Sequence, residues 1–174
     1  LDTAPTSSTT LTMAVGDALA ICLMKKRDFQ KSDFASFHPG GSLGKKLFIK
    51  VSDLLRKTNL PVVSRETLLK DAIVKMSEGR IGSVILVDKD ESVVGLLSDG
   101  DLRRALMNND FSLDCSVDSI ATMNPKLLDD VNLLASDALK VIEEYKIQLL
   151  LVVDTNKKLL GVLHIHDLVE AGIK

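Results

Sequence analysis

Aromatic side chains are scarce in this sequence, which has no Trp, one Tyr and five Phe among 174 residues. The core must therefore be built from Leu, Val, Ile and Ala, a composition that suits buried strands covered by helices. Hydrophobic residues make up 45% of the chain and charged residues 26%, which is the balance of a folded protein and not of a disordered one. The length suits one ordinary domain or two small ones.

Cysteine is also rare, and neither Cys22 nor Cys115 has a CxxC or Cys/His spacing around it. A disulfide framework and a structural zinc site are therefore not expected. His164 and His166 lie two residues apart, but the sequence offers no third ligand close by, and zinc sites use three or four protein ligands. We expect neither a metal nor another cofactor.

Long hydrophobic runs are missing as well. No uninterrupted apolar segment approaches the roughly 18 residues of a membrane span, and no basic segment followed by an apolar one opens the chain. These absences predict a cytoplasmic protein without a membrane partner. Because the first residue is Leu and not Met, we interpret the sequence as a piece of a longer polypeptide.

Charge is unevenly distributed around a net value of −2. Between residues 25 and 57 there are nine basic residues and three acidic ones. This stretch is either a solvated surface or a region that attracts a phosphorylated ligand. No nucleic-acid partner is expected, since the sequence has no recognised nucleic-acid motif and its net charge has the wrong sign.

The sequence repeats itself at a constant offset of 66 residues, as Gly161 follows Gly95. Chance would not keep one register through so many positions. The matched pairs are Asp71-Ala72 with Asp137-Ala138, Val87-Asp88 with Val153-Asp154, Gly95 with Gly161, and Asp101-Leu102 with Asp167-Leu168.

Each copy of the repeat is predicted to form a β-α-β-β-α unit. In the first copy, apolar residues at helical spacing from Leu69 onward indicate a helix. The apolar runs 83–87 and 93–97 indicate two strands joined by a short polar turn. Ser98 or Asp99 can cap a second helix, and a short extended segment precedes the first helix of each copy.

A single unit of this size would be marginal by itself, because small domains bury too little of their surface. Two units packed face to face would share a core and would be related by a pseudo-twofold axis. Grooves between them are natural ligand sites. The predicted fold class is therefore α/β, with modules at 52–112 and 116–174.

The segment Gly95–Asp101 resembles the nucleotide-binding signature of CBS domains: glycine, two apolar residues, Ser or Thr, two variable residues and Asp. The Ser98 hydroxyl could reach a phosphate, and the Asp101 carboxylate could accept hydrogen bonds from both hydroxyls of a ribose. Both side chains would serve equally well as plain helix caps. The second copy keeps Asp167 but has His164 at the Ser position, which weakens the case for phosphate contact there.

Residues 1–51 lie outside the repeat. A hydroxyl-rich segment with Ser7, Ser8 and Thr9 is predicted to be a loop before a helix, where these residues either contact a sugar phosphate or act as simple N-caps. Further on, His38 precedes a Pro-Gly-Gly turn. Histidine is the side chain best suited to proton exchange near neutral pH, although such a histidine can equally be structural.

In their order along the chain, these motifs closely resemble the arabinose 5-phosphate isomerase family. The segments that carry the resemblance are APTSSTT, GDALA, FHPGGSLGKK, SDGDLRR and the final GVLHIHDL. The resemblance implies that residues 1–51 are the C-terminal end of a sugar isomerase (SIS) domain and that a tandem CBS pair follows it. His164 is part of the likeness.

The resemblance also implies an activity, which is the interconversion of ribulose 5-phosphate and arabinose 5-phosphate for octulosonate synthesis in lipopolysaccharide or capsule. It assigns His38 to acid–base catalysis and a homotetramer to the parent enzyme. The family's remaining catalytic groups would precede Leu1, so this chain alone is predicted to be inactive.

Three hypotheses follow for the chain itself. In the first hypothesis, the chain regulates or supports the isomerase by binding an adenine or cytidine nucleotide, or a nucleotide-activated sugar, between its CBS modules. Alternatively, the CBS pair is a free-standing nucleotide sensor, with residues 1–51 as a linker. The third hypothesis is a platform that only self-associates through its CBS modules, with empty clefts.

Overall fold

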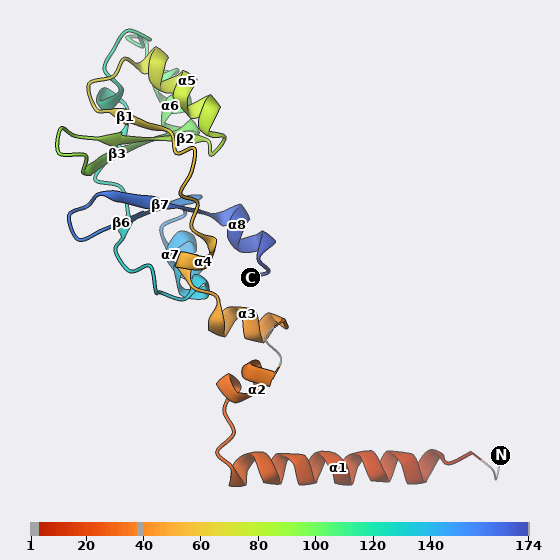
Figure 1. Ribbon diagram of the computed structural model, residues 1–174. Helices are drawn as coiled ribbons and strands as arrows, with labels where there is room; N and C mark the ends of the chain where they lie inside the picture. Colours follow the sequence, from red (N-terminus) through yellow and green to blue (C-terminus); the bar gives the residue numbers. More distant parts are fainter. Residues whose placement is uncertain (1–3, 38–39, 174) are drawn as a thin grey trace. The chain divides into compact units, whose positions relative to one another are not determined.

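The computed structural model describes residues 4–37 and 40–173, which form two compact units divided between Leu47 and Phe48. Each unit is described by itself (Figure 1). The candidate catalytic residue His38 lies outside the described residues.

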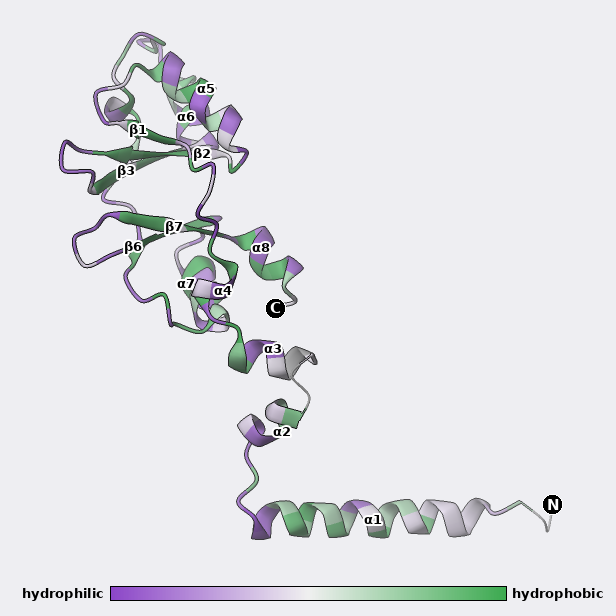
Figure 2. Ribbon diagram, viewed as in Figure 1, coloured by the Kyte–Doolittle hydropathy of each residue, from purple (hydrophilic) through white to green (hydrophobic). Residues whose placement is uncertain are grey.

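The first unit is helical. Its helices are α1 (Thr6–Lys26), α2 (Lys31–Phe37) and α3 (Ser42–Phe48), the last of which ends one residue inside the second unit. No residue of α1 is buried. Hydrophobic residues, coloured green in Figure 2, recur along much of the helix, and Leu11, Met13 and Leu19 are each at least 60% exposed.

The predicted loop around Ser7, Ser8 and Thr9 is wrong, because α1 already begins at Thr6. No side chain caps α1, and the Thr9 hydroxyl bonds within the helix, since Thr9 Oγ1 donates to the Thr6 carbonyl oxygen at 3.0 Å. Ser and Thr side chains can satisfy their hydrogen bonds in this way inside a helix. The loop prediction followed from composition alone, which does not separate these two arrangements.

Helix α1 also corrects the expectation about apolar runs. By length and composition it could cross a membrane, although it is the single helix of that kind within residues 4–37 and 40–173. Thr, Gly and Asp interrupt the apolar run, which is why counting uninterrupted residues missed it. An internal helix of a folded domain has the same length and composition, so this finding is weak support for a membrane span.

The second unit contains the two copies of the repeat, each folded as predicted into a β-α-β-β-α module. The first module has β1 (Val62–Ser64), α5 (Leu69–Gly79), β2 (Ser83–Val87), β3 (Val93–Ser98) and α6 (Asp99–Ala105). The second has β5 (Leu127–Leu128), α7 (Ala135–Glu144), β6 (Leu149–Val153), β7 (Leu159–His164) and α8 (Ile165–Glu170). In both modules the first strand is parallel to the second, which is antiparallel to the third (Figure 1).

Contacts between the modules obey the predicted pseudo-twofold symmetry. Ser92 forms a β-bridge with Lys158, its own counterpart 66 residues later, and such a self-paired contact must lie close to the axis. Two further β-bridges are related to each other by the same offset of 66 residues, which converts each of them into the other. They are Lys50 with Leu134 and Leu68 with Ser116.

The short segment before each module pairs with the sheet of the other module. The connection from the first module passes through the 3-10 turn η1 (Val117–Ser119) to β4 (Thr122–Met123), which is antiparallel to β3. Correspondingly, Arg56 exchanges two backbone hydrogen bonds of 3.0 Å with Val162 in β7. Thr122 follows Arg56 by the repeat offset, so the exchange is symmetric.

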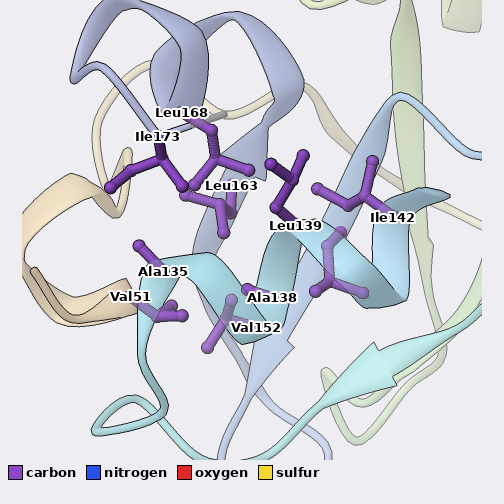
Figure 3. Close-up of a cluster of buried hydrophobic side chains, with 10 residues drawn as sticks. Val51, Ala135, Ala138, Leu139, Ile142, Val152, Leu163, Leu168 and Ile173 are labelled. Atoms are coloured by element: carbon purple, nitrogen blue, oxygen red, sulfur yellow. The ribbon is translucent and has the colours of Figure 1, made fainter. Parts of the chain in front are cut away.

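Three apolar clusters hold the second unit together. One lies beneath the helices of each module, and the third lies between the two sheets, where Ile85 and Val93 meet Leu151 and Val162. Helix α4 (Val51–Leu54) precedes the first module, yet Val51 is fully buried in the cluster of the second (Figure 3). The modules are therefore interlocked, with each of them completed by chain that leads into the other.

Gly161 tests this interlocking. A Cβ atom there would lie 2.6 Å from the Arg56 carbonyl oxygen, which is backbone, whereas a Cβ at Gly95 would first meet the Met123 sulfur at 3.1 Å. We expect Gly161→Ala to lower the free energy of unfolding by about 1–3 kcal/mol, and Gly95→Ala to cost less because Met can move. Urea unfolding of both variants measures the difference, and equal losses would contradict it.

Candidate functional site

A cleft of about 400 Å³ opens between the two modules at the start of α6. We call it cleft A. One side is formed by the end of β3 and the first turns of α6, and Thr122 of β4 lies beside them. The segment 146–149 of the second module supplies the opposite wall.

Ser98 and Asp101 form a reciprocal capping box at the start of α6. The Asp101 backbone N–H donates to Ser98 Oγ at 3.2 Å, and the Ser98 backbone N–H donates to Asp101 Oδ2 at 2.9 Å. The Ser98 hydroxyl also donates to Asp101 Oδ2 at 2.6 Å. The sequence folds in this way because Ser at the N-cap and an acidic residue at N3 satisfy free amides at the helix start.

The other oxygen of Asp101 accepts hydrogen bonds from two further residues. Arg104 Nη2 lies 2.5 Å from Asp101 Oδ1, and Thr122 Oγ1 lies 3.1 Å from it. Asp101 is only 7% exposed. Burial opposes ionisation, but the hydrogen bonds from Ser98, Thr122 and Arg104 outweigh it and hold the pKa of Asp101 below its ordinary value. Cleft A therefore contains a fixed, ionised carboxylate.

The rest of cleft A combines basic and apolar side chains. Four basic residues line it, against the two carboxylates of α6; they are Arg103, Arg104, Lys126 and Lys146. Ile81, Leu96 and Leu149 supply apolar surface. A buried carboxylate, a hydroxyl, several cations and an apolar wall are the groups that bind a ribose, a phosphate and a flat base.

The corresponding place in the second module is a different site. We call it cleft B and define it by Arg56, His164, Asp167 and Glu170, of which Arg56, Asp167 and Glu170 line a shallow depression. Asp167 Oδ2 accepts from the His164 backbone N–H at 3.3 Å, which repeats the capping contact of Asp101. The His164 ring stacks on that of His166, with ring centroids 5.0 Å apart.

The surroundings of His164 lower the pKa of its side chain. Burial lowers the pKa of its imidazole, and the nearby His166 and Arg56 lower it further, against the raising effect of Asp167. The neutral ring is therefore favoured in the folded protein.

The structure thus brings together some of the predicted site residues and separates others. Ser98 and Asp101 meet in cleft A, whereas Asp167 lies in cleft B. Ser7, Ser8 and Thr9 lie on α1 in the first unit. Of the described residues, no group of three or more His, Cys, Asp or Glu is placed to hold a metal.

Sequence reasoning missed Arg104 and Thr122. Arg104 could have been found, because it lies three residues after Asp101 and so shares its helix face. Thr122 had no local signal, since its contact with Asp101 spans 21 residues and depends on the pairing of β4 with β3.

The family follows from a comparison of the chain with known protein families. The CBS domain family matches residues 51–108 and 123–174, which agree with the two modules. The chain belongs to the CBS domain family. The predicted resemblance to arabinose 5-phosphate isomerases is also confirmed, as the chain is 41% identical over 174 residues to arabinose 5-phosphate isomerase KdsD of Pseudomonas aeruginosa.

That alignment covers 99% of this chain and 53% of the KdsD sequence. An uncharacterized protein of Helicobacter pylori (strain J99) is 54% identical over 174 residues, or 100% of this chain and 53% of its own length. The chain therefore spans about half the length of the curated relatives it matches. Among solved structures, the CBS modules resemble CBSX2 in complex with AMP, with 27% identity and a TM-score of 0.63 over 71% of this chain and 96% of that one.

The lowered pKa of His164 predicts a pH dependence of stability. An unfolded His164 titrates near 6.5, so below that pH the unfolded chain takes up a proton that the folded protein resists. We expect the free energy of unfolding to fall as the pH drops from about 7 through 6.5, and to level off below the folded pKa. Urea unfolding between pH 7.5 and 5 measures it.

His164→Ser is the control, because it places in the second module the residue found at Ser98. This variant should lose part of the slope, and a slope identical to that of the unsubstituted protein would contradict the assignment to His164.

Proposed function

We propose that this chain is the regulatory CBS portion of an arabinose 5-phosphate isomerase and that it binds a phosphorylated nucleoside in cleft A. The observation that carries the proposal is the buried, ionised Asp101 held at the mouth of a basic cleft by Ser98, Thr122 and Arg104. The similarity to KdsD supports the link to the isomerase. The complex of CBSX2 with AMP supports the class of ligand.

Each group of cleft A has a part in this binding. The Asp101 carboxylate accepts hydrogen bonds from the two ribose hydroxyls, which replace the bonds it now receives from Thr122 and Arg104. The Ser98 hydroxyl gives up its bond to Asp101 Oδ2 and donates to the phosphate, as does the released Arg104 guanidinium. Ile81, Leu96 and Leu149 offer the apolar surface against which the base packs.

The parent enzyme then carries out an aldose–ketose isomerisation in its SIS domain. Such a reaction moves a proton between the first two carbons of the sugar phosphate, and a second group moves a proton between the two oxygens. We assign His38 to this acid–base work and Ser7, Ser8 and Thr9 to the region that contacts substrate. Self-association through the CBS modules would join several cytoplasmic copies, so that a nucleotide bound to the CBS pair changes the free energy of substrate binding elsewhere.

A thermal-shift series tests the nucleotide site. AMP, ATP, CMP and cytidine-activated octulosonate are each added to the chain. We expect one of them at about a hundredfold excess over its Kd to raise the melting temperature by about 5 °C or more. Asp101→Ala should reduce the shift to about half or less, while Asp167→Ala, which removes the matching helix cap, should keep it. No shift with any of the four would favour a purely architectural role.

An isomerase assay tests the division of labour. We expect the chain alone to leave ribulose 5-phosphate unchanged, because the family's catalytic carboxylates and lysine are assigned to the part outside it. The full-length KdsD of Pseudomonas aeruginosa provides the positive control. Production of arabinose 5-phosphate by this chain would show that the assignment is wrong.

A further inference from the structure

The two clefts occupy equivalent positions in a symmetric pair, so any chemical difference between them comes from the side chains. The repeat offset of 66 identifies each counterpart. Ser98 corresponds to His164, Arg103 to Val169, Arg104 to Glu170 and Thr122 to Arg56, while Asp101 corresponds to Asp167. Of these five positions, only the aspartate is the same in both clefts.

The helix that faces each cleft carries different charges, because Arg104 of α6 corresponds to Glu170 of α8. Helix α6 contributes Arg103 and Arg104 to the lining of cleft A. Helix α8 carries Val169 and Glu170 at the equivalent places, and Glu170 lines cleft B next to Asp167. Two neighbouring carboxylates on a helix without the two arginines of α6 disfavour a phosphate. The Ser hydroxyl that could bind it is replaced by an imidazole whose protonated form is disfavoured, because burial lowers its pKa.

Arg56 is the one cation among the residues that line the depression, and Arg80, which corresponds to Lys146 of cleft A, follows α5. The guanidinium of Arg56 is already engaged. Arg56 Nη2 donates to the Gly79 carbonyl oxygen at the end of α5 at 2.9 Å, and the side chain is partly buried. In cleft A the opposite wall is the segment 146–149, which follows α7. The corresponding segment in the first module is 80–83, which follows α5. The Arg56 side chain therefore reaches from the β7 edge to the last residue of α5, which directly precedes the segment 80–83. Thr122, its counterpart in cleft A, is short and stays beside Asp101.

We propose that each chain binds one phosphorylated nucleoside, in cleft A alone, and that Arg56, His164 and Glu170 close cleft B to it. This inference rests on the proposed function, since it concerns which of two equivalent clefts takes the ligand. Arg56 blocks the space, His164 removes the phosphate-binding hydroxyl, and Glu170 repels the phosphate. The retained Asp167 keeps its role as a helix cap.

Isothermal titration of the 174-residue chain with AMP tests the stoichiometry. We expect one AMP per chain. Asp101→Ala should weaken binding by about ten- to a hundredfold, which corresponds to hydrogen bonds to a charged group. Asp167→Ala is the matched control, because it removes the same cap from α8, and it should leave both the stoichiometry and the affinity unchanged.

The outcomes separate this inference from the proposed function. Two AMP molecules per chain, or loss of binding in Asp167→Ala but not in Asp101→Ala, would confirm a nucleotide-binding CBS pair and overturn the single-cleft inference. Absence of binding by AMP, and by ATP and CMP under the same conditions, would overturn the proposed function and this inference with it. Unfolding curves of the free variants establish that each one is folded.

A second variant tests the three closing side chains directly. Arg56→Thr, His164→Ser and Glu170→Arg together give cleft B the residues that cleft A has at Thr122, Ser98 and Arg104. We expect this triple variant to bind two AMP molecules per chain, and a further Asp167→Ala substitution to return the number to one. A folded triple variant that still binds one AMP would overturn the assignment of the closure to these side chains.

Discussion

Apolar contact between the two sheets is the interaction on which the rest of the second unit depends. Ile85 and Val93 of the first module and Leu151 and Val162 of the second are at most 4% exposed, and they meet in one cluster between the sheets. Each module offers a short sheet with helices on its other side, and neither sheet could leave its inner face in water without losing this burial. The pseudo-twofold arrangement buries both faces at once. The position of the clefts follows from it, because they lie between the modules where strands end and helices begin.

The exchanged segments convert this contact into an interlocked unit. The chain leading into the first module completes the core of the second through Val51, and the chain leading into the second completes the sheet of the first through Thr122. The second of these exchanges also builds the site, because it carries the Thr122 hydroxyl to within 3.1 Å of Asp101. Strand β4 therefore contributes both to the stability of the sheet and to the ligand site. Symmetry places Arg56 at the equivalent position in the other cleft.

The repeat places two clefts at equivalent positions, whereas side-chain replacement accounts for their different chemistry. Cleft A keeps a carboxylate whose hydrogen bonds offset its burial. Cleft B keeps the carboxylate as a helix cap and has Glu170 where cleft A has Arg104. Under the proposed function, a symmetric scaffold that binds its ligand in one cleft can distinguish its two ends.

The sequence by itself determined the repeat, its offset, the β-α-β-β-α order and the capping pair of Ser98 and Asp101, because these depend on local periodicity and on contacts between residues close in the chain. It did not determine where α1 begins, since Ser and Thr suit a loop and a first helical turn alike. Only the tertiary structure decided that Thr122 and Arg104 share Asp101, and that Arg56 reaches Gly79. The contacts of Thr122 and Arg56 join residues 21 and 23 positions apart through strand pairing, which no local pattern encodes.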